Sequence, residues 1–262
     1  MSQSTETVLI TGASSGIGLE LAKCFAADRS NLVLVARNRD ALETLSGQLK
    51  ERHGIKVHVL AADLSLPESS KTIFQELASV DISVDILVNN AGFGLHGEFV
   101  KLPLSRQLEI IHVNIVALTE LTGLFLPGMI QRGRGGVLNV GSVAGFLPGP
   151  YLAVYYASKS FVQSFTEALA AETSGTGIKI SVLCPGPTES NFGIVARGGA
   201  PRQHERAKMS AQTVARIGHR QFRRDKAIVI PGIANRLLVF LPRIVSRSFA
   251  RTVVKRYNRL RK

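Results

Sequence analysis

The sequence predicts a doubly wound α/β fold, in which helices cover both faces of a seven-stranded, parallel, Rossmann-type sheet. Short apolar runs rich in β-branched residues alternate along the chain with longer stretches of helical periodicity. The runs are apolar almost throughout, which is typical of strands that are buried on both faces of a parallel sheet. The length of 262 residues is within the range of one hydrophobic core. We therefore expect a three-layer α/β/α sandwich.

Two sets of segments make up this sandwich. We expect strands at residues 8–10, 32–36, 57–61, 86–88, 137–140, 180–183 and 228–230. We expect helices at about residues 16–28, 39–52, 67–80, 103–131, 153–174 and 208–224. The pair Ser65 and Pro67, and also Pro103, are typical of helix starts. Together the segments form one Rossmann-type domain at residues 1–242, which includes a segment at about 187–225, and a C-terminal extension follows at 243–262.

The composition indicates a globular protein of a reducing compartment. Hydrophobic residues make up 45% of the chain and charged residues 19%, as in average soluble domains. Cys24 and Cys184 alone make no disulfide framework, and the histidines lack the spacing of metal ligands. The polar N-terminus leads directly into the first apolar run, and no run approaches the roughly 20 apolar residues of a membrane span. We expect a cytoplasmic protein without a metal site.

The positive charge of the chain is concentrated at its C-terminal end. The formal net charge is +13, and residues 226–262 contain ten Lys or Arg and neither Asp nor Glu. Within residues 243–262, apolar residues recur at every fourth position, namely Val245, Phe249, Val253 and Tyr257. Basic residues follow a track displaced by two positions, or about 200° of helix, namely Arg243, Arg247, Arg251, Lys255 and Arg259. We expect an amphipathic helix.

Several partners suit a helix of this kind. It packs on the domain or on a second subunit with its arginines solvated, or it lies on an anionic membrane surface. A membrane offers both apolar burial and electrostatic attraction. Acidic partners and nucleic acid are further alternatives, and nucleic acid is disfavoured because no base-reading motif or array of stacking aromatic residues accompanies the charge.

A glycine-rich turn joins the first predicted strand to the first predicted helix. Its sequence, TGASSGIG, spans residues 11–18, and a helical rhythm follows at once. Gly12, Gly16 and Gly18 let the backbone turn tightly and approach a ligand, while the free N–H groups of a helix N-terminus favour phosphate. Glycines also serve ordinary turns, so the context of strand, turn and helix is what favours a dinucleotide pyrophosphate.

The second predicted strand ends in the sequence ARNR at residues 36–39. In dinucleotide-binding folds a carboxylate at this point binds the adenosine ribose, whereas an arginine accommodates the 2′-phosphate of NADP. Arg37 offers a planar, permanently charged donor group, and no carboxylate stands at the strand end to repel the phosphate. A solvated loop charge is the alternative for Arg37 and for Arg39. The position of Arg37 favours NADP(H) as the cofactor.

These motifs, in their order along the chain, resemble those of the short-chain dehydrogenases/reductases. The resemblance covers roughly residues 7–190, and it rests on TGASSGIG at 11–18, Asp63, NNAG at 89–92, Asn114, Ser142, Tyr155-x-x-x-Lys159 and Pro185-Gly186. It implies an oxidoreductase that interconverts a carbonyl and an alcohol, in a homo-oligomer that is a dimer or a tetramer. Residues 87–94 and 146–169 are similar to hydroxysteroid and 3-ketoacyl reductase-like members, which act on lipophilic substrates.

The resemblance assigns roles to individual residues. It implies that Tyr155 protonates the carbonyl oxygen as hydride arrives, that Ser142 hydrogen-bonds this oxygen, and that Lys159 binds the nicotinamide ribose. It further implies that Asn114 holds a water in the proton relay and that Asn90 stabilises the sheet beside the cofactor. The implied cofactor-binding residues are Gly12, Ser14, Ser15, Gly16, Ile17, Gly18, Arg37, Asn38, Asp63, Leu64, Asn90, Tyr155, Lys159, Pro185, Gly186 and Thr188.

Elementary chemistry agrees with the pairing of Tyr155 and Lys159. Residues four apart on a helix share a face. A free tyrosine has a pKa of about 10, and a neighbouring ammonium group favours the phenolate, so Lys159 is the natural activator. Each residue of the tetrad of Asn114, Ser142, Tyr155 and Lys159 has an ordinary structural explanation when it is taken singly. The alternative for the whole set is a catalytically idle NADP(H)-binding sensor or scaffold, which the intact tetrad disfavours.

Candidate pocket residues, most of them apolar, follow three of the motifs and predict an apolar ketone or alcohol as substrate. They are Phe93, Leu95, His96, Phe146, Leu147, Tyr151, Phe192 and Ile194. Packing in the core is an equal alternative for each of them. The glycine-containing segment 187–208 is expected to form either a cover over the site or an ordinary surface loop.

Overall fold

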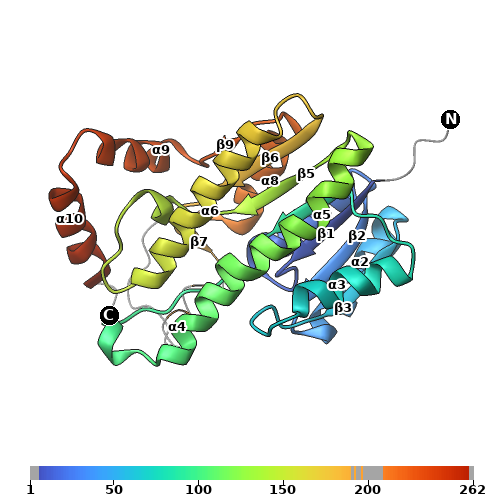
Figure 1. Ribbon diagram of the computed structural model, residues 1–262, viewed down its shortest axis with the longest axis horizontal. Coiled ribbons are helices and arrows are strands. Elements are labelled where there is room, and N and C mark those ends of the chain that lie inside the picture. Colours follow the sequence, from blue (N-terminus) through green and yellow to red (C-terminus); the bar gives the residue numbers. More distant parts are fainter. Residues whose placement is uncertain (1–5, 190–191, 193–195, 197–208, 260–262) are drawn as a thin grey trace.

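Helices cover both faces of a seven-stranded parallel sheet in the computed structural model, which describes residues 6–189, 192, 196 and 209–259 (Figure 1). The strands are β1 (Thr7–Thr11), β2 (Asn31–Ala36), β3 (Val57–Ala61), β4 (Ile86–Asn89), β5 (Gly135–Val140), β6 (Ile178–Leu183) and β9 (Ile228–Val229). Their order in the sheet is β3-β2-β1-β4-β5-β6-β9. The predicted fold class is confirmed, and each of the seven predicted strands is present.

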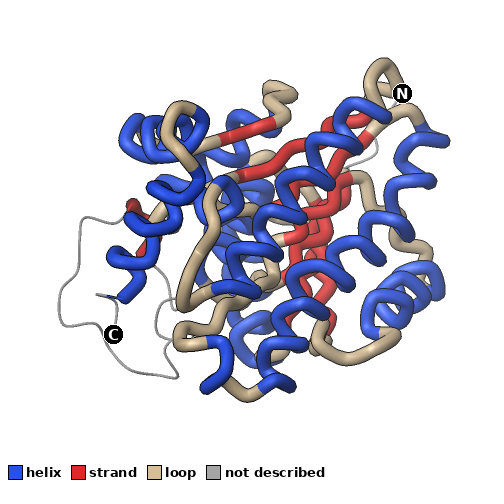
Figure 2. Tube along the Cα trace, turned by 60° about the vertical axis from the view of Figure 1, so that its left-hand side comes forward, coloured by secondary structure: helices blue, strands red, loops and turns tan. Residues whose placement is uncertain are grey.

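Alternation along the strands explains the two helical layers (Figure 2). Val8 and Ile10 pack into one buried cluster, and Leu9 between them packs into the cluster on the other face. The first cluster lies under α1 (Gly16–Ala27), α2 (Arg39–His53) and α8 (Ala211–Arg223). The second lies under α3 (Ser69–Ser79), α5 (Leu118–Arg132) and α6 (Ala153–Glu172). Burial on both faces is what the nearly continuous apolar runs predict.

A single long helix crosses the second face. It comprises α4 (Leu104–Ile111), a π-helical segment (His112–Ala117) and α5. By length and composition this segment, Leu104–Arg132, passes as a candidate membrane span, and 44% of its most apolar window is buried. Polar residues interrupt it, which is why no uninterrupted apolar run marks it in the sequence. The buried residues of α5 pack in the core against β4 and β5, as in the core helix of a globular domain.

Several elements after β6 differ from the sequence prediction. Residues 188–189 (β7) and 209–210 (β8) form a short parallel pair beside the cavity, and α9 (Ile233–Phe240) follows β9. A short 3₁₀ helix at Leu241–Arg243 follows α9, and two others, at Phe99–Lys101 and Val143–Phe146, lie before β6. The last helix, α10 (Arg247–Arg259), lies within the extension predicted at 243–262.

Helix α10 packs on the domain, which is one of the alternatives left open by the sequence. Its buried face consists of Ala250, Val254 and Asn258, a set that the sequence analysis did not single out. Asn258 Nδ2 donates to the Pro150 carbonyl (2.9 Å), and Asn258 O lies 3.0 Å from His96 Nε2. The packing face lies between the two predicted tracks, so the apolar track and the basic track flank it.

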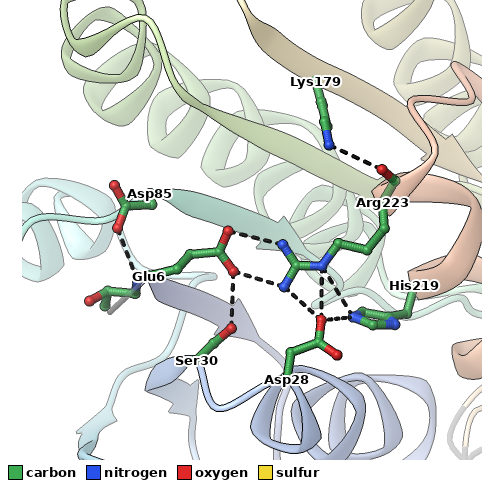
Figure 3. A network of polar contacts seen from close by, with 8 residues as sticks. Glu6, Asp28, Ser30, Asp85, Lys179, His219 and Arg223 are labelled. Atoms are coloured by element: carbon green, nitrogen blue, oxygen red, sulfur yellow. Dashed lines mark hydrogen bonds and ion pairs between the residues drawn. The ribbon is translucent and has the colours of Figure 1, made fainter. Parts of the chain in front are cut away.

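A network of charged side chains ties α8 to the amino ends of the strands (Figure 3). The Arg223 guanidinium donates to both carboxylate oxygens of Glu6 (2.8 and 2.9 Å) and to Asp28 Oδ2 (3.0 Å). His219 Nε2 lies 2.9 Å from the same Asp28 oxygen, and burial lowers the pKa of His219 below its usual value. This end of the sheet is closed by ion pairs, and the carboxyl ends of the strands face the cavity described below.

The contact between α1 and the turn after β1 generates a first prediction. A methyl group added at Gly18 would overlap the Gly12 carbonyl oxygen and the Asn90 side chain, whereas one added at Gly47 in α2 meets nothing within 4 Å. We expect Gly18→Ala to lower the free energy of unfolding by about 1–3 kcal/mol, because helix and strand must separate. Gly47→Ala is expected to be neutral or to stabilise by up to about 1 kcal/mol. Urea unfolding of both variants checks this, and equal stabilities would contradict it.

Candidate active site

A cavity of about 860 Å³ lies at the carboxyl ends of the parallel strands. It opens where the strand order reverses between β1 and β4, the usual ligand position in open α/β sheets. Fifteen of the sixteen predicted cofactor-binding residues line it, and Gly18 is the exception. Of the predicted catalytic residues, Ser142, Tyr155 and Lys159 line the cavity, and Asn114 does not.

The glycine turn is held in place from the neighbouring strand. Asn90 Nδ2 donates to the carbonyl oxygens of Thr11 (2.9 Å) and Gly12 (3.2 Å). In return, Thr11 Oγ1 accepts from the backbone N–H groups of Asn90 and Ala91, both at 3.0 Å. Gly12 has φ +66°, and an added Cβ there would lie 2.8 Å from the Asn90 side-chain nitrogen. Only glycine therefore suits this turn.

The turn ends at the N-terminus of α1, where donors for an anion are available. Ser15 is the N-cap residue, and its side chain makes no capping hydrogen bond. The N–H groups of the first helical turn therefore point towards the cavity without a side-chain acceptor from the cap. A glycine cradle followed by free helix N–H groups fits the pyrophosphate of a dinucleotide.

The turns after β2 and β3 form the far end of the cavity. Arg37 is exposed on its rim, and Asn38 caps α2 by accepting from the Ala41 N–H group (3.0 Å). Burial alone would raise the pKa of Asp63. Hydrogen bonds to Asp63 Oδ1 from the Ser65 backbone (3.0 Å) and hydroxyl (2.8 Å), together with the Arg37 charge, outweigh burial and lower that pKa. This end of the cavity thus combines a cation with an ionised carboxylate.

Tyr155 and Lys159 lie one turn apart near the start of α6, as the sequence predicts. Lys159 is 6% exposed, and its Nζ donates to the Val140 carbonyl at the end of β5 (2.7 Å). Burial lowers the pKa of Lys159 from 10.5 to about 8. The ammonium nitrogen lies 5.9 Å from the centroid of the Tyr155 ring. The Tyr155 ring also contacts Phe192, at 5.0 Å between centroids.

Ser142 is positioned by the 3₁₀ helix that follows β5. Its Oγ accepts from the Ala144 N–H group (3.1 Å) and lies 3.4 Å from the Pro185 carbonyl oxygen, which it faces as a donor. It is therefore the N-cap of Val143–Phe146. This capping arrangement holds the hydroxyl at the wall that it shares with Tyr155 and Lys159.

Asn114 lies behind the cavity wall, within the π-helical segment. Its Oδ1 accepts from the Phe93 N–H group (3.1 Å), and its Nδ2 donates to the Phe93 carbonyl (3.1 Å) and to Ser158 Oγ (2.9 Å). Both N–H bonds of the amide are thus used to hold the segment after β4 against α6. A π-helical insertion is often found at functional sites. The predicted role of Asn114 in holding a water stays a prediction.

The predicted substrate pocket is correct only in part. Phe93, Leu147 and Phe192 line the cavity. Four other predicted residues do not line it: Leu95, His96, Phe146 and Tyr151. Phe146 packs in a separate apolar cluster, and the His96 and Tyr151 rings stack on each other. Ile194 and most of segment 187–208 lie outside the described residues.

Sequence reasoning missed the wall that α9 and α10 contribute. The lining residues from these helices are Ala234, Asn235, Leu238, Val253, Val254 and Tyr257. Asn235 closes on the turn after β6, where a methyl group added at Gly186 would overlap its amide. The four-residue apolar track did include Val253 and Tyr257. Nothing in its periodicity shows which neighbour it packs against.

Comparison with known proteins adds to this geometry. A family model described as short chain dehydrogenase matches residues 6–197. Sulfoacetaldehyde reductase 2 of Chromohalobacter salexigens is 36% identical over 74% of this chain and 77% of its own length. The very-long-chain 3-oxoacyl-CoA reductase of Rattus norvegicus is 34% identical over 69% of this chain, and the match spans 58% of that relative.

A solved structure agrees with these relatives. A short-chain dehydrogenase from Sphingobium yanoikuyae, in complex with NADPH, superposes with a TM-score of 0.82 and 34% identity. The match covers 88% of this chain and 90% of that one. The family match extends over the glycine turn, Ser142, Tyr155 and Lys159. The chain belongs to the short-chain dehydrogenase/reductase family of oxidoreductases.

Proposed function

We propose that the protein uses NADP(H) to interconvert a lipophilic ketone or aldehyde and its alcohol, with Tyr155 as the proton donor and acceptor. The observation that carries the proposal is the common cavity of the glycine turn, Arg37 and the group of Ser142, Tyr155 and Lys159. The cavity therefore has dinucleotide-binding features at one end and a positioned acid at the other.

The residues around the cavity suit NADP(H) in particular. The glycine turn and the N-terminus of α1 would hold the pyrophosphate, and Arg37 would pair with the 2′-phosphate. Among the described residues, Arg37 forms no ion pair with a carboxylate of the chain, so its N–H groups are available. The NADPH bound to the Sphingobium yanoikuyae relative supports this choice.

The residues at the catalytic end of the cavity would stabilise the negative charge that develops on the substrate oxygen. The bound cofactor would supply hydride to the carbonyl carbon. Tyr155 then gives its hydroxyl proton to the oxygen that becomes negative, while Ser142 donates a hydrogen bond to the same oxygen. Lys159 stabilises the resulting phenolate, because its ammonium group lies beside the Tyr155 ring in a buried site. The reverse reaction uses the same groups in the opposite order.

An apolar lining favours a lipophilic substrate. Phe93, Leu147, Phe192 and Leu238 line the cavity, and the Phe192 ring contacts Tyr155. Apolar walls favour substrates that bury carbon surface. The relative named for very-long-chain 3-oxoacyl-CoA is consistent with this lining, whereas the sulfoacetaldehyde reductase acts on a small, charged aldehyde by its name. We therefore rest the substrate class on the lining itself.

Tyr155→Phe tests the proposal directly. Purified protein is incubated with NADPH and a panel of ketones that differ in size and polarity, and the loss of NADPH absorbance is followed. We expect Tyr155→Phe to lower turnover about 10²- to 10⁴-fold, because no proton is available for the oxygen. The affinity for NADPH should remain, since the ring is preserved. Tyr151→Phe, outside the cavity lining, is the control. Substantial turnover by Tyr155→Phe would refute the role.

Arg37→Asp tests the cofactor preference. We expect the affinity for NADPH to fall about 10- to 100-fold relative to that for NADH, because a charge-assisted contact is replaced by a repelling carboxylate. Arg39→Asp makes the same change of charge two residues away, where Arg39 lies 3.7 Å from Glu43 and does not line the cavity. Its effect on the ratio should be much smaller. Fluorescence titration with both cofactors measures the ratios, and equal effects would contradict the assignment.

The buried state of Lys159 predicts a dependence of stability on pH. Its pKa is about 8 in the folded protein and near 10.5 in its ordinary state. A lowered pKa contributes stability that is present above the unfolded pKa and is lost as the pH falls through the folded pKa. The free energy of unfolding of the wild type, relative to that of Lys159→Met, should therefore rise by about 2–3 kcal/mol between pH 7.5 and pH 10. Urea unfolding across this range measures the difference in the free energy of unfolding between the two proteins. A difference that does not change with pH would contradict the lowered pKa of the buried Lys159.

A further inference from the structure

Helices α9 and α10 carry an unusual concentration of exposed apolar side chains. Of the 20 large apolar residues that are exposed in the described part of the chain, 8 lie within residues 233–253. Seven of them are at least half exposed and define what we term the α9–α10 surface: Ile233, Leu237, Phe240, Leu241, Ile244, Phe249 and Val253. These helices form one margin of the molecule, at the left in Figure 1. Such a concentration of exposed apolar side chains is typical of an interaction surface.

Basic residues are interleaved with this surface. Arg236 is exposed and stands three residues after Ile233 and four before Phe240, so it shares their side of α9. Arg256 is exposed and follows Phe249 by seven residues, which places the two about 20° apart around α10. No Asp or Glu occurs after Asp225 in the sequence. In the part of the chain that the structure describes, neither Arg236 nor Arg256 forms an ion pair with a carboxylate, so the surface combines apolar side chains with an uncompensated positive charge.

The same surface reaches the mouth of the active-site cavity. Leu238 and Val253 both line the cavity and are 41% and 51% exposed. Each of the two helices therefore has an apolar side chain that belongs to the cavity wall and to the outer surface at once. A lipophilic molecule that reached the surface would meet apolar side chains as far as the cavity.

We propose that the α9–α10 surface docks on an anionic lipid membrane. The apolar side chains enter the interfacial region of the bilayer, and Arg236 and Arg256 pair with lipid phosphates. The cavity mouth, bordered by Leu238 and Val253, then opens against the lipid. A second copy of the chain suits the surface less well, because a two-fold contact would bring its uncompensated cations together. Nucleic acid would match the charge but would leave the apolar side chains exposed.

Sedimentation with vesicles tests the docking with the full chain. Vesicles of pure phosphatidylcholine are compared with vesicles that contain phosphatidylserine, at low and at high salt. We expect binding to the phosphatidylserine vesicles, and weaker binding at high salt because the charge attraction is screened. The proposal would be overturned if the protein bound neither kind of vesicle, or if it bound both kinds equally.

Two double variants distinguish binding by the α9–α10 surface from non-specific binding by exposed apolar residues elsewhere on the protein. Leu237→Ser/Phe249→Ser removes one side chain from each helix, 60% and 59% exposed, neither of which lines the cavity. We expect at least about tenfold weaker vesicle binding. Leu66→Ser/Val80→Ser removes side chains that are 61% and 51% exposed beside α3, and binding should be unchanged. Equal binding by the two double variants would refute the assignment of the surface.

Substitution is preferable to truncation, because residues 250, 254 and 258 are buried against the domain and Val253, Val254 and Tyr257 line the cavity. The charge component is tested by Arg236→Gln/Arg256→Gln, which should lose most of the preference for phosphatidylserine. Analytical ultracentrifugation without lipid provides the remaining test. A wild-type dimer that Leu237→Ser/Phe249→Ser converts to a monomer would show that a second copy covers the surface, and would overturn the membrane proposal.

Discussion

The hydrogen bonds between Asn90 and the end of β1 are the constraint on which the site depends. Where the strand order reverses, the segments that follow the two neighbouring parallel strands leave towards opposite faces of the sheet. Here Asn90 and Thr11 join the ends of β1 and β4 by four hydrogen bonds. The same hydrogen bonds also position the glycine turn. They therefore determine both how the two strands are joined and the shape of the proposed cofactor site. Gly12 and Gly18 lie too close to Asn90 to carry side chains. The site is therefore a consequence of how β1 and β4 meet.

A second chain of polar contacts links this junction to α6, which carries Tyr155 and Lys159. Asn89 Nδ2 donates to Asn139 Oδ1 (2.9 Å) across β4 and β5, and Asn139 Nδ2 donates to Thr166 Oγ1 in α6 (2.9 Å). The buried Lys159 adds a contact from α6 to the end of β5. Burial disfavours the charged form of that lysine, and the same low-polarity surroundings would strengthen its proposed effect on Tyr155. Helix α6 is thereby fixed by groups buried inside the domain.

The sequence was sufficient for the parts of the protein that follow local rules. The short, nearly continuous apolar runs predicted the seven strands, and the strand, turn and helix context predicted the glycine turn. The residues it missed depend on contacts distant in sequence. Asn235, for example, lines the cavity because α9 folds back on the turn after β6, which no local pattern records. His96 and Tyr151 were expected in the pocket, yet they stack on each other beside α10.

The amphipathic tail shows why periodicity alone is insufficient. Two tracks about 200° apart leave two further faces between them, and α10 packs by one of these, through Ala250 and Val254. Small side chains allow the helix to approach the domain closely enough for Asn258 to reach Pro150. Phe249 and Val253 consequently stay exposed, and Val253, which also lines the cavity, extends its apolar wall to the surface. The choice of packing face thus determines both the shape of the cavity mouth and the character of the surface around it.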